Sequence, residues 1–543
     1  MRFPDRADSA EMSQARFPTL IHVWIGALFA AILLRTFLMP VPPNDLWWQL
    51  ATGRLIVETG GIPTHDVFSF TQAGRPYYDQ PWLAQLLMYG LHRVGGVPLL
   101  LVVQAALVSL AYAILLRLCV LRTGAAKLSV GLLLLTMPVT ATSWTPRSQM
   151  FALPLFVAFL FILSDWRLRL RRAVSATGGD ALWLLPPLMV LWVNLHGSFV
   201  LGGVLVALTF AGVWLERYPA ARNLAAPNLA ADDSGPRNGS RSGPAPSLRP
   251  LVLWGALTAA AILLNPRGIG VLGYVANLTL DPTIRSMVTE WGMTTIASLD
   301  GKVFFAFATV LAFVLAFAQR RPDPVDVLLA VAFFCLGLSG RRHAVWFGLA
   351  AAPLLVVQAA SLARPRAVPL VRPRDRSHVG GQGNRTLNIA FLAAFALLTF
   401  AVLPWNKPRL ALPPGVRSVI SASTPVDAVR FLREESSPPE RVFQSEGYGS
   451  YLMWAAPERT VFIDTRIELY PAGQWLDYQR LGAGLLLDTL VRRYDLDGLL
   501  IDNRRQARLL AEIGRRPEWE VRYSDDRTTY AVRRGEPEEP TGG

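Results

Sequence analysis

Repeated apolar runs, many of them close to the length that crosses a bilayer, constrain the fold of this chain more than any other feature. A helix needs roughly 20 apolar residues to cross the hydrocarbon core of a membrane. The chain has 543 residues, of which 52% are hydrophobic and only 17% charged, whereas a soluble protein carries charge on about a quarter of its residues. Hydropathy predicts about eleven membrane-spanning helices, near residues 19–39, 97–119, 127–143, 148–164, 182–195, 198–215, 250–265, 302–319, 324–339, 343–362 and 387–405.

The distribution of basic residues predicts how these helices are oriented. Lys and Arg cluster in short segments between the apolar runs, and these segments fall on one side of the membrane, which is typical of cytoplasmic loops. The N-terminus joins that side, and an odd number of spans places everything after Trp405 outside. The same clustering beside anionic lipid accounts for the net charge of +14, so we do not expect nucleic acid as a partner.

Composition divides the chain into a membrane domain, residues 1–405, and a C-terminal domain, residues 406–543. The C-terminal domain has the composition of a soluble domain, and its patterns predict a small extracytoplasmic α/β domain. Its expected strands lie at 441–443, 460–465, 496–502 and 528–534, and its expected helices lie after Pro425 and over 481–494.

Two segments of the membrane domain, 217–249 and 363–386, are predicted to be flexible cytoplasmic linkers, because they have too few apolar residues to order themselves. The two cysteines, Cys119 and Cys335, both lie in apolar runs. Neither a disulfide framework nor a thiolate metal site is therefore expected.

The first outer loop, residues 40–80, concentrates acids and aromatic side chains at the predicted outer face. Asp45 follows the first span and lies beside Trp47 and Trp48. Such a carboxylate would be partly desolvated, which raises its pKa and suits it to accept a proton from an acceptor hydroxyl. Asp45 could also cap a helix that lies on the membrane, with the tryptophans at the interface. Both roles are compatible, because capping would also fix the carboxylate in place.

Loops far apart in the sequence add further polar side chains to the same face. They are Arg147 in WTPRSQ, Asn194 and His196 in VNLHGS, Asn265 and Arg267 in LNPRG, Glu290 in TEW, and Arg341, Arg342 and His343 in GRRHAVW. Outer arginines need a counter-ion, and guanidinium matches phosphate oxygens bidentately. A single arginine is better explained by pairing with an outer carboxylate or a lipid phosphate, but for the group we favour a phosphate-bearing ligand. The histidine and asparagine of VNLHGS could line a cavity or serve helix packing.

Five more polar residues are candidates for accessory roles: His65, Asp66, Asp79, Asp464 and Arg466. A histidine with carboxylates could hold a divalent metal, but the outer-loop residues lack a regular ligand spacing, so the metal requirement stays open. The pair Asp464 and Arg466 follows the glycine-containing segment GYGSY and could hold a sugar or a phosphate. We rank a structural Asp–Arg pair, fixing this loop to the membrane part, above that interpretation.

Distinctive motifs stand in five segments: PNDLWWQLATGRLIVETGGIPTHDVFSFT, WVNLHGSFVLG, LNPRGIGVL, VTEW and GYGSYLMWAAPERTVFIDTRIELY. Together they resemble a group of bacterial multi-span proteins similar to GT-C glycosyltransferases, which include protein O-mannosyltransferases, oligosaccharyltransferases and aminoarabinose transferases. The resemblance implies a helical protein of the bacterial plasma membrane that moves a sugar from a polyprenyl-phosphate carrier to an acceptor on the outer face. An acidic residue in the first outer loop of such enzymes acts as base or helps to bind metal, and the matching position here is Asp45. The loop departs from the family in having no tight acidic pair.

We therefore expect a GT-C-like membrane glycosyltransferase of hexosyl or pentosyl type, acting on a glycan, lipid or protein acceptor. Asp45 is its expected catalytic carboxylate, and the expected phosphate- and substrate-binding residues are Arg267, Arg341, Arg342, His196, His343, Asn194 and Glu290. A lipid or polysaccharide flippase would place its charges deep within spans rather than at their ends. A non-catalytic scaffold would use the outer domain to bind cell-envelope polymer.

Overall fold

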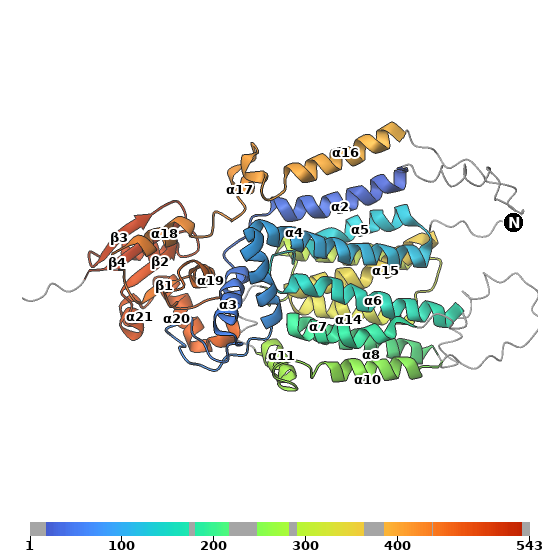
Figure 1. The fold of residues 1–543 in the computed structure, drawn as a ribbon, viewed down its shortest axis with the longest axis horizontal. Coiled ribbons are helices and arrows are strands. Elements are labelled where there is room, and N and C mark those ends of the chain that lie inside the picture. Colours follow the sequence, from blue (N-terminus) through green and yellow to red (C-terminus); the bar gives the residue numbers. More distant parts are fainter. Residues whose placement is uncertain are drawn as a thin grey trace, which may run out of the picture.

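The fold has two parts, a bundle of long helices and a small α/β domain at one end of the bundle (Figure 1). A computed structural model describes residues 18–172, 180–216, 247–281, 290–362, 385–436 and 438–534. The bundle contains α2 (Leu20–Leu38), α4 (Trp82–Thr123), α5 (Ala126–Ala141), α6 (Gln149–Arg172), α7 (Leu185–Leu195), α8 (Val200–Leu215), α10 (Arg249–Ala261), α13 (Leu299–Phe317), α14 (Pro324–Ser339), α15 (Ala344–Leu362) and α16 (Arg385–Ala401). Each predicted span coincides with one of these helices.

The lengths and composition of the helices are those of a multi-pass membrane protein. Within the described ranges, 6 helices are long and apolar enough to cross a membrane: α2, α4, α6, α8, α13 and α15, the helices α8 and α15 together with the turns before them. The remaining predicted spans form the shorter helices α5, α7, α10, α14 and α16. The helical membrane fold is thus confirmed, while the count of about eleven crossings stays a prediction.

The helices differ in how much of their surface packs inside the bundle. The most apolar windows of α6 and α15 are 72% buried, whereas those of α2 and α13 are only 28% and 22% buried. Large side chains on α13, such as Phe313 and Phe317, are exposed. Extensive exposed apolar surface of this kind is expected where lipid covers a protein. Helices α6 and α15 therefore form the centre of the bundle, and α2 and α13 lie at its periphery.

A bend in α4 fixes where its span begins. Gly96 has φ 65° and ψ −163°, a conformation that glycine adopts without the steric penalty of a side chain. Pro98 follows in the first turn of the second segment, where its missing N–H is not needed. The segment after the bend matches the predicted span 97–119. The segment before it packs on the first outer loop, where a Cβ on Gly53 would come within 2.3 Å of the Gln85 carbonyl oxygen.

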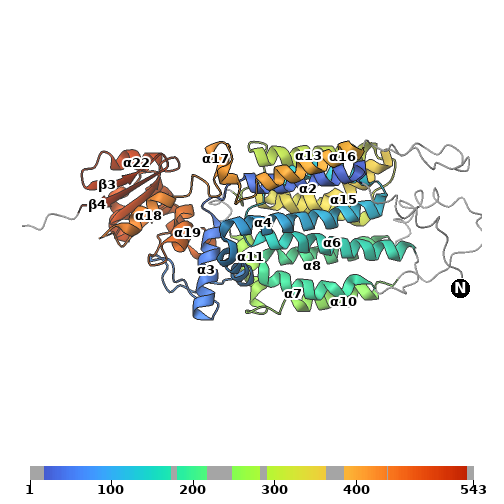
Figure 2. The same cartoon turned by 45° about the horizontal axis from the view of Figure 1, so that its top comes forward.

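The first outer loop forms α3 (Asp45–Thr59), which lies across the end of the bundle (Figures 1 and 2). Asn44 occupies the N-cap position and Asp45 is the first helical residue. Helix α3 also contacts the C-terminal domain, because Arg54 donates hydrogen bonds to the carbonyl oxygens of Met453 (3.1 Å) and Trp454 (3.3 Å). The loop is therefore held between the bundle and the domain.

The C-terminal domain is built on one sheet with strand order β1-β2-β4-β3. Its strands are β1 (Val442–Gln444), β2 (Gly498–Asp502), β3 (Trp519–Ser524) and β4 (Thr528–Arg533). Strands β1 and β2 are parallel, and the other two pairs are antiparallel. Its helices are α17 (Pro414–Arg417), α18 (Val426–Glu434), α19 (Glu446–Ala455), α20 (Ala472–Gly482), α21 (Leu487–Tyr494) and α22 (Ala507–Ile513). The strands predicted at 441–443, 496–502 and 528–534 and the helix after Pro425 are confirmed.

The prediction of a strand at 460–465 is wrong. This segment is extended but joins no sheet, and its one ladder contact is an isolated parallel bridge between Ser69 and Val461. The Val461 amide donates to the Phe68 carbonyl oxygen (2.9 Å), and the Phe70 amide donates to the Val461 carbonyl oxygen (3.1 Å). The first outer loop thus bonds the backbone at Val461, while side chains of the C-terminal domain, among them Gln444, bond the backbone at Phe462 and Ile463. Strand β3, at the sheet edge, was not predicted, because most of its side chains are exposed and give no apolar alternation.

The two predicted cytoplasmic linkers lie almost wholly outside the described residues. Only their ends are described, where Arg249 begins α10 and Arg385 begins α16.

Candidate active site

A cavity of about 540 Å³ lies between the ends of the bundle helices and the C-terminal domain. Its walls come from the first outer loop, the α5–α6 and α7–α8 turns, α11 (Gly270–Leu280), the turn before α15, and loops of the C-terminal domain. Charged and imidazole side chains that line it are Asp45, Arg147, His196, Glu290, Arg342, His343, Glu446, Arg466, Glu468, Asp502 and Arg505. The cavity therefore joins segments that are far apart in the sequence.

Asp45 enters this cavity at the start of α3. Its Oδ1 accepts a hydrogen bond from the Trp48 indole nitrogen (3.4 Å), and its Oδ2 lies 3.2 Å from Nη1 of Arg147. The side chain is 27% exposed. Asp45 thus has a guanidinium partner in addition to the neighbouring tryptophan, as expected for a single outer arginine that pairs with an outer carboxylate.

Arg147 connects two carboxylates across the cavity. The same Nη1 that contacts Asp45 lies 3.0 Å from Oε2 of Glu290, and the arginine side chain is only 9% exposed. The charge of Arg147 is the main reason why the pKa of Glu290 is lowered. Gln49 of α3 fixes the turn, since its Oε1 accepts from the Ser148 amide (2.9 Å) and its Nε2 donates to the Ser148 hydroxyl (3.1 Å). Arg147 is therefore held in position by the bonds of the next residue, Ser148, as well as by its own ion pairs.

Arg342 differs from Arg147 in having no carboxylate in ion-pair contact among the residues that the structure describes. Its guanidinium lies over the Trp291 ring, 4.3 Å from the ring centroid, an arrangement stabilised by cation–π attraction. Its backbone amide donates to the Glu290 carbonyl oxygen (3.1 Å), which ties the turn before α15 to the segment that carries Glu290. His343, the next residue, packs edge-on against Trp291, with the ring centroids 6.0 Å apart.

His196 lies in the turn between α7 and α8. Its Nδ1 accepts a hydrogen bond from the Ser198 amide (3.1 Å), so in the neutral ring the proton is on Nε2. Burial, and then the charges of Arg342 and Arg147, lower the pKa of His196 well below its ordinary value. His196 is therefore a neutral hydrogen-bonding group of the cavity at pH 7.

Three predicted residues, Asn194, Arg267 and Asp79, lie beside the cavity rather than in its wall. Asn194 accepts from the Trp82 indole nitrogen (2.9 Å) and donates to the Leu264 carbonyl oxygen (2.9 Å), which joins three segments of the bundle end. Arg267 donates to the Tyr77 carbonyl oxygen (3.1 Å). Asn194 and Arg267 thus both make hydrogen bonds that account for their positions.

Asp79 is buried next to a separate small cavity of about 100 Å³, to which Arg267 also contributes. Its Oδ1 accepts from Gln85 (2.6 Å), and its Oδ2 has no partner in the described part of the chain. Burial raises the pKa of Asp79 to about 7. His65 is exposed, and neither it nor Arg341 is among the described residues that line the main cavity.

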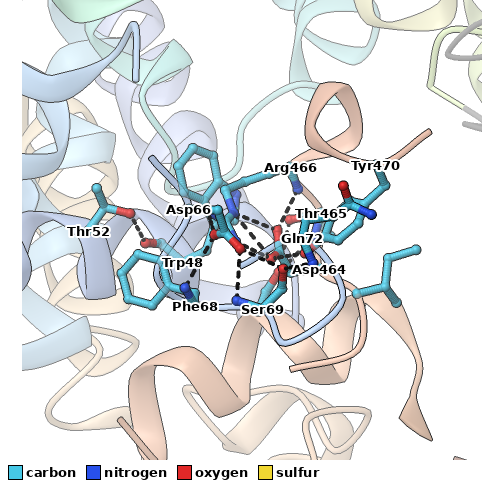
Figure 3. Close-up of polar contacts among 12 residues, drawn as sticks. Trp48, Thr52, Asp66, Phe68, Ser69, Gln72, Asp464, Thr465, Arg466 and Tyr470 are labelled. Atoms are coloured by element: carbon cyan, nitrogen blue, oxygen red, sulfur yellow. Dashed lines mark hydrogen bonds and ion pairs between the residues drawn. The ribbon is translucent and has the colours of Figure 1, made fainter. Parts of the chain in front are cut away.

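Asp66, Asp464 and Arg466 form a buried ion cluster between the first outer loop and the C-terminal domain (Figure 3). Nη1 of Arg466 lies 2.7 Å from Oδ1 of Asp66, and its Nη2 lies 2.6 Å from Oδ2 of Asp464. Tyr470 also donates to Asp464 (2.5 Å), and Asp66 accepts from the Ser69 amide (3.0 Å). This arrangement matches the structural Asp–Arg pair that the sequence favoured, with Asp66 as a third member.

Sequence reasoning missed Glu468 and Arg505, which the C-terminal domain contributes to the cavity. Tyr274 of α11 donates a hydrogen bond to Glu468 (2.8 Å), and burial raises the pKa of Glu468. Glu468 lies in the DTRIELY segment, two residues after Arg466 and four after Asp464, so its place in the sequence beside these candidates could have predicted it. Arg505 carries no such signal, because it follows an ordinary strand.

The described residues do not fit a divalent metal site. No group of three or more His, Cys, Asp or Glu side chains in the described ranges is placed to hold an ion. The two carboxylates that face each other in the cavity, Asp45 and Glu290, are both paired with Arg147.

Comparisons with known proteins show the fold. No protein-family model and no curated protein matches the sequence. The oligosaccharyltransferase of Archaeoglobus fulgidus in the apo form superposes with a TM-score of 0.50 at 12% identity, over 94% of this chain and 74% of that chain. Archaeal oligosaccharyltransferase AglB from the same organism, in complex with an inhibitory peptide and a dolichol-phosphate, gives a TM-score of 0.50 at 13% identity over 88% and 69%. ArnT from Cupriavidus metallidurans bound to undecaprenyl phosphate gives 0.48 at 12% identity over 93% and 97%.

Oligosaccharyltransferases are among the GT-C enzymes that the sequence resembles, and the likeness extends over both the helical bundle and the C-terminal domain. This chain is therefore a multi-pass membrane protein with a GT-C-like fold.

Proposed function

We propose that this protein is a membrane glycosyltransferase that moves a sugar from a polyprenyl-phosphate carrier to an acceptor outside the cytoplasm. The observation that carries the proposal is the single cavity that holds Asp45, Glu290, Arg147 and Arg342 at the junction of bundle and C-terminal domain. A carboxylate and an arginine without a carboxylate partner are the two groups that such a transfer requires. The complex of AglB with a dolichol-phosphate supports a polyprenyl-phosphate carrier for this fold.

Asp45 is the proposed base. Its carboxylate takes the proton of the acceptor nucleophile as that atom bonds to the anomeric carbon, and the bond from this carbon to the phosphate oxygen breaks with its electrons on the phosphate. Arg147 orients the carboxylate from one side and Trp48 from the other. Because a single carboxylate acts, the configuration at the anomeric carbon is inverted, by analogy with inverting glycosidases.

Arg342 is the proposed partner of the departing phosphate. A guanidinium offers paired N–H donors that match two phosphate oxygens, and it stabilises the charge that develops on the leaving group. Stacking on Trp291 fixes the plane of the guanidinium while leaving its edge donors for the ligand. His196 contributes a neutral donor to the same cavity.

The proposed orientation places this cavity at the outer face, with a cytoplasmic N-terminus and an extracytoplasmic C-terminal domain. The carrier then approaches from the bilayer, and the acceptor approaches between the bundle and the domain. Glu446, Glu468 and Arg505 of the domain line that side of the cavity and are proposed to contact the acceptor.

The test compares sugar release from polyprenyl-phosphate sugars by purified wild-type protein, Asp45→Asn and Arg342→Gln. General-base catalysis contributes about 10²–10⁴-fold, so Asp45→Asn should lose activity by that factor while its bound carrier lipid, measured by mass spectrometry, is unchanged. Arg342→Gln should instead lose bound carrier. Activity of Asp45→Asn near the wild-type level would remove Asp45 from the mechanism, and bound carrier without any sugar release by the wild type would favour a flippase.

A further inference from the structure

The most unusual feature of the cavity is that one nitrogen atom contacts two carboxylates from distant segments. Nη1 of Arg147 lies 3.2 Å from Oδ2 of Asp45 and 3.0 Å from Oε2 of Glu290. The carboxylates are separated from the arginine by 102 and 143 residues. Two neighbouring carboxylates either share a proton, which raises the pKa of one of them, or are neutralised by a cation. Here the charge of Arg147 lowers the pKa of Glu290, so the cation is the arginine.

In oxygen-rich enzyme sites that cation is commonly a divalent metal, which binds carboxylates together with further oxygen ligands. Here no third carboxylate, histidine or cysteine of the described ranges joins the pair. A second cation acts on the pair, because the charge of Arg342 also lowers the pKa of Glu290. A metal ion placed between Asp45 and Glu290 would be repelled by a guanidinium that cannot lose its proton.

Arg147 is also held in place by burial of its side chain and by hydrogen bonds of the turn that carries it. Its side chain is 9% exposed, and the next residue, Ser148, exchanges two hydrogen bonds with Gln49 of α3. These bonds fix the turn that carries the guanidinium, and burial restricts the conformations open to its side chain.

We propose that Arg147 is the resident cation of this site: its guanidinium occupies the position between Asp45 and Glu290 and excludes a divalent metal ion from the carboxylate pair. Arg147 acts as a positioning residue, because it holds Asp45 and Glu290 toward the cavity without itself taking or giving a proton. That these carboxylates then serve sugar transfer rests on the proposed function, whereas the exclusion of metal does not.

The test measures Mn²⁺ binding by electron paramagnetic resonance on the full-length protein in nanodiscs of zwitterionic lipid at pH 7. Wild-type protein should take up no Mn²⁺ that depends on Asp45. Arg147→Gln removes the charge but keeps a hydrogen-bonding side chain, and it should bind Mn²⁺ at least about tenfold more tightly than the wild type, because the guanidinium that lies between the two carboxylates is then gone. Adding Asp45→Asn to Arg147→Gln should abolish the gain.

Two further variants separate charge from folding. Arg147→Lys keeps the positive charge and should stay at the wild-type level. Arg75→Gln removes an exposed arginine of the first outer loop, the loop that also carries Asp45; Arg75 bonds to Gln72, and the variant serves as the matched control. Gel filtration and thermal melting establish that each variant is folded.

Asp45-dependent Mn²⁺ binding by the wild type would overturn the proposal. Binding by Arg147→Gln no tighter than that of the wild type, or binding by Arg147→Lys as tight as that of Arg147→Gln, would also overturn it, because the charge of Arg147 would then not be what excludes the ion. Failure of the transferase assay would bear on the proposed function and leave this result intact.

Discussion

Replacing Arg466 by glutamine should detach the C-terminal domain from the first outer loop. The guanidinium is 2% exposed, and the carboxylates of Asp66 and Asp464 are both 0% exposed. Without the arginine, two buried carboxylates face each other with no cation between them. The ring faces of Phe68 and Tyr77 also lose the charge that lies 5.3 and 5.2 Å from their centroids.

The magnitude follows from the depth of burial. Breaking a buried ion pair by removing one partner costs about 3–5 kcal/mol, chiefly because the other charge is left uncompensated. Asp66→Asn should cost less, about 1–3 kcal/mol, because Arg466 keeps Asp464 as its counter-ion and only hydrogen bonds to the charged group are lost. The destabilisation of the double variant Asp66→Asn/Arg466→Gln should be smaller than the sum of the two single destabilisations by about 0.5–3 kcal/mol, because the two residues share one cluster.

Hydrogen exchange with mass spectrometry measures this contact directly. The amides of Phe70 and Val461 are bonded across the interface, so Arg466→Gln should accelerate their exchange by about 10²–10³-fold, as 1.4 kcal/mol corresponds to a factor of ten. The exposed Arg75→Gln is the matched control and should change exchange little. Wild-type exchange rates in Arg466→Gln, or strictly additive losses in the double variant, would refute the idea that this cluster fastens the domain.

Three further outcomes are expected. The pKa of Asp79 is about 7 in the folded protein and about 4 in the unfolded chain, so the free energy of unfolding falls as pH rises from about 4 to 7. Asp79→Asn should therefore raise the apparent melting temperature more at pH 8 than at pH 5. An equal rise at both pH values would contradict this. A Cβ on Gly447 would lie 2.3 Å from the Pro43 carbonyl oxygen. Gly447→Ala should therefore destabilise the contact between the C-terminal domain and the first outer loop by about 1–3 kcal/mol, which limited proteolysis would detect as faster cleavage of the domain. Protease resistance equal to that of the wild type would argue against close packing at this position. An impermeant thiol reagent on intact cells should label Asp526→Cys, whose parent side chain is 83% exposed, but not Arg374→Cys in the second linker; the reverse pattern would invert the proposed orientation.

Part of the candidate site could be predicted because span ends mark where chains meet at a membrane face. Asp45, His196, Glu290 and Arg342 were all singled out at such ends, and the structure places all of them in one cavity. Arg267 and Asn194 satisfied the same criterion but have structural hydrogen bonds beside the cavity. A position near a span end thus predicts that a side chain lies at the same end of the helix bundle as the others, but it does not predict which contacts the side chain makes there.

The sequence by itself determined the helical membrane fold, the boundaries of the loop between the first two spans and three of the four strands of the C-terminal domain. These features depend on local properties: an apolar run of bilayer length favours a helix wherever it occurs, and short runs rich in β-branched and aromatic residues favour strands. Such properties can be read from neighbouring residues alone.

Only the tertiary structure decided how the charges pair. Whether Asp45 stands beside tryptophans alone or beside Arg147 depends on a contact across 102 residues. Segment 460–465 lies outside the sheet because its backbone is bonded by the first outer loop at Val461 and by the Gln444 side chain at Phe462 and Ile463. The energy of a charge is set by the nearest opposite charge and by burial, both of which are properties of the folded molecule. The sequence therefore identified Asp45 and Glu290 as candidate functional carboxylates, and the fold determined that the guanidinium of Arg147 lies between them.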